Sequence, residues 1–154
     1  MKTLAALLML FALASANAAV ISNTTSTVSF QTFVPCANGG QGEVVDIHGQ
    51  MKTLFTWTVA NGVVNGIFKN APQAMTGLGE STGLAYHFSG TTTETFHIPV
   101  VNLPYGTYKA QLNYFLISQG GEPNLDMHET INFGFSPDGQ FLFIFHDSFF
   151  VTCR

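Results

Sequence analysis

The sequence predicts a small all-β domain: an antiparallel meander closed into a β-barrel, or alternatively a β-sandwich, with one disulfide. Apolar and polar residues alternate along several segments, Gly, Asn and Pro punctuate them, and no stretch shows helical periodicity. Several predicted strands are long, and one contains Gly49, where it can bend. Long, bent strands favour a barrel, because the strands of sandwiches are usually shorter.

The N-terminus has the pattern of a secretory signal peptide. Lys2 precedes an unbroken apolar run over residues 4–14, and Ala16-Asn17-Ala18 supplies the small residues that signal peptidase requires. The run is shorter than the roughly 20 apolar residues that cross a bilayer, and no Cys follows the cleavage site. We therefore expect a signal peptide over 1–18, a single all-β domain over 19–154, and a secreted or periplasmic protein without a lipid anchor.

The charge of the predicted mature chain argues against two classes of partner. Its basic residues are Lys52, Lys69, Lys109 and Arg154, against nine Asp and Glu residues. So few cations cannot form a face that neutralises phosphates or anionic lipids. We expect no nucleic-acid partner and no stable membrane insertion.

The two cysteines, Cys36 and Cys153, are predicted to form a disulfide that joins the start of the domain to its end. An even cysteine count in an exported chain is typical of such a bond. Two free, buried thiols are the alternative.

The first predicted hairpin follows the long strand over 45–59. Asn61-Gly62 suits a type I′ turn, in which both central residues take positive φ. This turn would place Trp57 across the side-chain-free Gly66. The segment 71–83 is predicted to be a loop. The paired residues would be Val59 with Val64, Trp57 with Gly66, and Phe55 with Phe68.

Shorter strands are expected around residues 86–88 and 96–98, and a long one over 108–116. The last hairpin is predicted to turn at Pro137-Asp138-Gly139. It would pair Phe135 with Phe141, Phe133 with Phe143, and Ile131 with Phe145. The predicted core is Phe55, Trp57, Val59, Phe68, Tyr86, Leu112, Tyr114, Ile131, Phe133, Phe143 and Phe145. The predicted exposed set is His48, Thr56, Thr58, His87, Gln111, Asn132 and His146.

One local cluster of polar residues follows from this last register. His146 would lie opposite Thr130, and His128 opposite Ser148, so that the two imidazoles are diagonal neighbours on the polar face. Such a pair could bind a metal or relay a proton, but a metal site needs three or four converging ligands with orienting partners. A solvent-facing polar row is the expected interpretation of His128, Thr130 and His146, and no metal site is predicted.

The other candidate groups do not form a catalytic pattern. Glu129 and Asp147 fall on the apolar side of their strands, and we expect a β-bulge to turn them outward. No Ser has the G-x-S-x-G context, and the glycine-rich segment 77–83 lacks the Lys and the following helix of a phosphate loop. We predict no catalytic residue, no metal and no cofactor.

Several segments together resemble a group of small secreted bacterial β-proteins to which no activity is attached. The resemblance covers most of the mature chain and implies only export and an all-β fold. It is carried by Thr76-Gly77-Leu78-Gly79, Thr82-Gly83, Tyr86, Leu116-Ile117-Ser118-Gln119-Gly120, Asn124-Leu125, His128-Glu129-Thr130 and Cys153-Arg154.

These observations favour a non-enzymatic secreted binding or interaction module. An aromatic-rich β-domain can carry a small apolar ligand, or can bind another protein through a sheet face or edge. The alternatives are a β-barrel enzyme of the cyclase or isomerase type and a structural surface protein. An outer-membrane barrel, with the phenylalanines facing lipid, is disfavoured by the C-terminal disulfide and by the small number of long strands.

Overall fold

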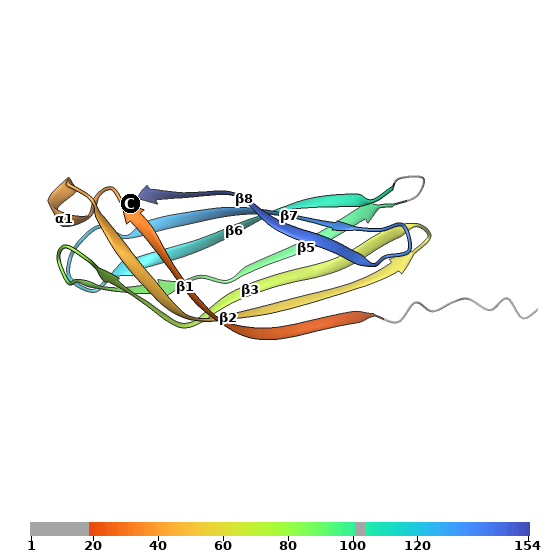
Figure 1. The fold of residues 1–154 in the computed structure, drawn as a ribbon, viewed down its shortest axis with the longest axis horizontal. Coiled ribbons are helices and arrows are strands. Elements are labelled where there is room, and N and C mark those ends of the chain that lie inside the picture. The colour runs from red at the N-terminus through yellow and green to blue at the C-terminus, as the bar shows by residue number, and fades with distance from the viewer. Residues whose placement is uncertain (1–18, 101–103) are drawn as a thin grey trace, which may run out of the picture.

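The structure, a computed structural model, describes residues 19–100 and 104–154. In this part of the chain every strand belongs to one antiparallel sheet, which curves into an open half-barrel with its strands along the long axis (Figure 1). A single turn, α1 (Ala37–Gly40), follows the first strand. The strands are β1 (Val20–Val34), β2 (Glu43–Ala60), β3 (Val63–Gly79), β4 (Ala85–Ser89), β5 (Thr92–Pro99), β6 (Gly106–Ser118), β7 (Leu125–Phe135) and β8 (Phe141–Cys153).

The sheet follows chain order, as the predicted meander requires. Its neighbours run β1-β2-β3-β4-β6-β7-β8, and β5 pairs with β3 beyond the end of β4. The long strand β3 therefore has two successive partners on one side. Its residues 63–70 pair with β5 and its residues 75–78 pair with β4, so β4 and β5 act as one strand interrupted at Gly90 and Thr91.

The β2–β3 hairpin confirms the predicted turn and register. Asn61 and Gly62 have φ values of 52° and 72°, and Trp57 pairs with Gly66. The covering of Gly66 was predicted wrongly, because Phe96 lies there: a Cβ on Gly66 would meet the Phe96 Cζ at 2.2 Å. The predicted loop over 71–83 is also wrong in its first part, since β3 continues to Gly79.

The β7–β8 hairpin follows the predicted register only at its turn. Gly139 has a φ of 83° and Phe135 pairs with Phe141, as expected. Register shifts between Gly134 and Phe135, and again between Thr130 and Ile131, change every pair beyond the turn. The observed pairs are Phe133 with Ile144, Ile131 with His146, and Thr130 with Ser148.

The core occupies the concave side of the sheet, and most of the predicted core residues are buried there. Phe55 contacts the rings of Phe68, Phe96, Phe133 and Phe135, with centroids 5.2–5.8 Å apart. The two predicted core residues of β8, Phe143 and Phe145, are not buried. Phe145 is 50% exposed and stacks on the partly buried Phe143 on the outer face, because the bulge between Gly134 and Phe135 reverses their orientation. His48, His87 and Gln111 are exposed as predicted, whereas Thr56, Thr58 and Asn132 are half-buried.

The two edges of the sheet, β1 and β8, approach each other without backbone pairing in the described ranges. The rings of Phe30 and Phe149 meet edge to face across this seam, with centroids 6.2 Å apart. The predicted disulfide is confirmed: Cys36, just after β1, is bonded to Cys153 at the end of β8, where α1 and the C-terminus lie side by side (Figure 1). The seam thus takes the place of the predicted full closure.

The structure bears on membrane-spanning helices but not on the predicted signal peptide. No helix in the described ranges is long and apolar enough to span a membrane. The predicted signal peptide, residues 1–18, lies outside the described residues.

Removing the disulfide is expected to destabilise the domain. The bond closes a loop of 117 positions, and loss of such a long cross-link by Cys36→Ser with Cys153→Ser should lower the free energy of unfolding by about 4–5 kcal/mol. Urea unfolding followed through Trp57, the single tryptophan, measures the change. Wild-type protein with reductant should match the double variant. A loss below about 1 kcal/mol would show that the seam holds without the bond.

Candidate functional site

A hollow of about 630 Å³ lies inside the half-barrel, beside the seam. Both sheet edges line it, β1 through Val28 and β8 through Phe149, and the middle strands form its floor. Its size falls in the range of about 300–1,000 Å³ that is typical of small-ligand sites. Its apolar walls include Val28, Phe30, Phe88, Leu112, Ile131 and Phe149.

Alternation along the strands explains the apolar walls. Leu112 and Tyr114 of β6 are buried on the concave side, whereas their neighbours Gln111 and Asn113 are exposed on the convex side. Because side chains along a strand point alternately to opposite faces, the concave side collects one residue in two from each strand.

A chain of hydrogen bonds forms the polar part of the hollow. The Thr53 hydroxyl donates to Asn70 Oδ1 at 2.9 Å, and Asn70 Nδ2 donates to the Tyr114 hydroxyl oxygen at 2.9 Å. The three residues come from β2, β3 and β6. Asn70 and Tyr114 meet beside the interruption between β4 and β5. There the Thr92 hydroxyl donates to the Asn113 carbonyl and accepts from the Asn113 N–H.

Glu129 of β7 adds a negative charge to this polar group. It continues the inward alternation of Met127, pairs with Leu112, and lines the hollow. Burial, and then the charge of Glu129, raise the pKa of the Tyr114 phenol, against a smaller lowering by Asn70. The Tyr114 hydroxyl therefore stays protonated at neutral pH and is a donor to the hollow.

The prediction that a bulge turns Glu129 outward is wrong. The bulge exists, but it begins one residue later, between Thr130 and Ile131, and the extra residue is Asp147 on the opposite strand. Glu129 still pairs with Phe149 in regular register.

The predicted cluster of His128, Thr130 and His146 depended on a β7–β8 register that differs from the observed one. His128 pairs with Phe150, stacks on its ring at 4.8 Å, and shares a 2.6 Å hydrogen bond between its Nδ1 and Asn113 Oδ1. Thr130 is buried, and His146 pairs with Ile131 through its backbone. In the described ranges no three His, Cys, Asp or Glu side chains are grouped as a metal would need.

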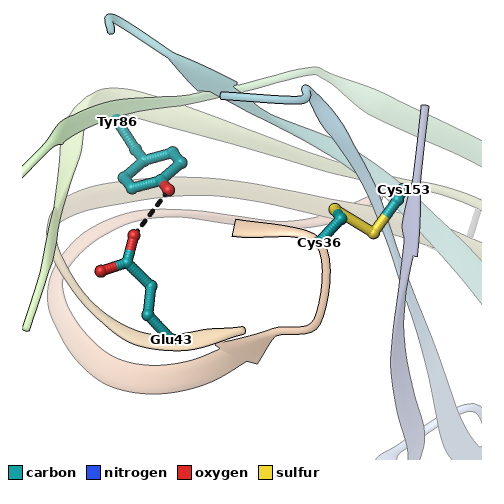
Figure 2. The surroundings of a disulfide bond; sticks show 4 residues. All are labelled: Cys36, Glu43, Tyr86 and Cys153. Carbon is teal, nitrogen blue, oxygen red and sulfur yellow. Dashed lines mark hydrogen bonds between the residues drawn. A yellow bond between two sulfur atoms is a disulfide. The ribbon is translucent and has the colours of Figure 1, made fainter. Parts of the chain in front are cut away.

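A buried carboxylate, that of Glu43, lies near the disulfide (Figure 2). It accepts hydrogen bonds from the Thr82 backbone N–H at 3.1 Å, from the Thr82 hydroxyl at 2.9 Å, and from the Tyr86 hydroxyl at 2.9 Å. Burial alone raises the pKa of Glu43, but the combined donors outweigh it and hold the pKa below the usual value. Glu43 thereby fastens the segment 80–84 to the first residue of β2, which is a structural role.

The chain matches no known protein family, no characterised protein and no solved structure. The geometry of the hollow is therefore the guide to the function of this chain.

Sequence reasoning missed Asn70, Glu129 and Glu43 as members of polar groups. Glu129 carried a usable signal, because it stands at an inward position of a strand whose other inward residues are apolar. Asn70 carried none, since its partner Tyr114 is 44 residues away.

Replacing Glu43 by Gln should destabilise the protein by about 2 kcal/mol, because an amide presents hydrogens to donors that need an acceptor. The wild-type contribution is present above the usual glutamate pKa of 4.5 and is lost as the pH falls through the lowered folded-state pKa. Thermal unfolding at a series of pH values measures both effects. Glu122→Gln, in the β6–β7 turn, is the matched control. If the Glu43 variant loses stability at low pH as the wild type does, the role assigned to the Glu43 carboxylate is wrong.

Proposed function

We propose that this protein is an exported, non-enzymatic binding module that holds a small, largely apolar ligand in the hollow of the half-barrel. The observation that carries the proposal is the hollow itself: about 630 Å³, mostly apolar walls, and one polar group of Thr53, Asn70, Tyr114 and Glu129. Ligand sites commonly combine an apolar cavity with a few placed polar groups.

Export is part of this proposal. The signal-peptide pattern at residues 1–18 and the disulfide between Cys36 and Cys153 both suit a secreted or periplasmic protein. In such a compartment a carrier meets apolar molecules in dilute solution, and burial of their surface supplies the affinity.

Binding is favoured over catalysis by the state of the polar groups. A general base must be deprotonated near the working pH, and burial beside Glu129 keeps the Tyr114 phenol protonated. A nucleophile would need an adjacent base, and the disulfide leaves no free cysteine in the described ranges.

A bulky residue at the mouth should block ligand entry. Val28 of β1 is half-buried at the hollow, so Val28→Trp is expected to weaken binding of N-phenyl-1-naphthylamine, a neutral apolar dye, by about tenfold or more. Dye fluorescence titration measures the affinity, and native mass spectrometry of protein from its source tests for a retained ligand.

The matched control is Ile67→Trp on the convex side of β3, where Ile67 is 42% exposed. It should leave dye binding unchanged. Absence of saturable binding by the wild type, or equal binding by the Val28 variant, would contradict the proposed function.

A further inference from the structure

We infer that the ligand of the hollow carries a hydrogen-bond acceptor oxygen, such as a carbonyl oxygen, on its apolar body, and that the Tyr114 hydroxyl donates to this oxygen. This inference rests on the proposed function and names the ligand class for the same site. Tyr114 belongs to β6, in the middle of the sheet, and is among the residues that line the hollow.

The direction of the hydrogen bonds around Tyr114 determines what its hydroxyl can offer to a ligand. The Thr53 hydroxyl donates to Asn70 Oδ1, and the amino group of the same Asn70 amide donates to the Tyr114 oxygen. In this hydrogen bond the Tyr114 hydroxyl accepts, so its own proton is not used there. Because a phenol has one proton to donate, the hydroxyl presents a donor to whatever fills the hollow.

Burial keeps this donor protonated and makes it selective. Tyr114 is 2% exposed, and burial is the main cause that raises the pKa of its phenol. An apolar ligand without an acceptor would cover the phenol and leave its proton without a partner, which weakens binding. Sites with a buried hydrogen-bonding group reject an analogue that lacks the complementary atom for this reason. The hollow should therefore prefer a ligand with an acceptor oxygen to a hydrocarbon of the same shape.

The test compares two neutral probes of the same shape: benzophenone, and 1,1-diphenylethylene, in which a methylene group replaces the carbonyl oxygen. Each probe displaces N-phenyl-1-naphthylamine from the disulfide-bonded protein near neutral pH. Because both probes are neutral, their comparison does not depend on the charge of Glu129 or on the groups that Glu129 contacts. The quantity compared between variants is the ratio of the two affinities, from which the affinity of the dye cancels.

Tyr114→Phe removes the donor and keeps the aromatic ring. This variant should bind benzophenone about fivefold more weakly, because one hydrogen bond is lost, and should change the affinity for 1,1-diphenylethylene by less than about twofold. A ratio that stays at the wild-type value would overturn the inference, whether both probes bind as before or both weaken equally.

Asn70→Asp tests the direction of the hydrogen bond while the phenol stays in place. A carboxylate only accepts, so it should draw the Tyr114 proton toward itself and away from the ligand. The ratio should fall about as far as in Tyr114→Phe. An unchanged ratio in Asn70→Asp would show that the Tyr114 proton does not distinguish the two probes, and would overturn the inference.

The controls keep this inference separate from the proposed function. Tyr105→Phe removes a phenol hydroxyl that is 49% exposed and is not among the described residues that line the hollow, so it should leave the ratio unchanged. Thermal unfolding shows whether each variant folds. If the dye binds saturably and Val28→Trp weakens this binding, the proposed function stands whatever the ratio shows. If the dye does not bind to the wild type, the proposed function fails, and the inference about its ligand fails with it.

Discussion

The rest of the structure depends on the seam where the two sheet edges meet without backbone pairing among the described residues. A curved antiparallel sheet of this kind buries its concave face only if its edges come together, and here β1 and β8 do so through side chains and one covalent bond. Backbone closure would have fixed the edges in register along their whole length. The disulfide fixes them at one end only, and so leaves room beside the seam. The hollow lies in that room, with Val28 on one edge and Phe149 on the other.

The hairpins show what the sequence could and could not predict of the fold. Along β2 and β3 apolar and polar residues alternate, and the Asn61-Gly62 turn admits one register, so pattern and turn chemistry gave the correct pairs. Residues 141–145 of β8 read Phe-Leu-Phe-Ile-Phe, which is apolar at every position. Such a run satisfies either face, so alternation cannot detect an inserted residue. The bulge at Leu142 therefore went unpredicted, and Phe145 came to lie outside the core.

The site was less predictable than the fold, for a related reason. Inward positions of Tyr114 and Leu112 followed from alternation, and both are buried. The hydroxyl of Tyr114 acquires its orientation from Asn70, which belongs to another strand and takes its own orientation from Thr53. These contacts depend on how far the sheet curves, and the curvature arises from bulges such as the one at Gly49. The register from which the histidine cluster was predicted, that of β7 and β8, was wrong for a similar reason, since bulges shift it.

The position of the hollow along the molecule follows from how its two ends are packed. At the end with the β2–β3 turn, aromatic rings fill the concave side: Phe55, Trp57, Phe96, Phe135 and Phe141 contact one another, and Trp57 donates to the Gly139 carbonyl at 2.9 Å. At the other end the disulfide and the hydrogen-bonded Glu43 fasten the strands (Figure 2). Neither end can expand to admit a ligand without losing its ring contacts, its disulfide or its hydrogen bonds. In the middle of the half-barrel β4 gives way to β5, and the described residues that meet across the seam there include Phe30 and Phe149. For the proposed binding module, this arrangement would let an apolar ligand enter beside the seam while the polar group of Tyr114 and Glu129 stays in place.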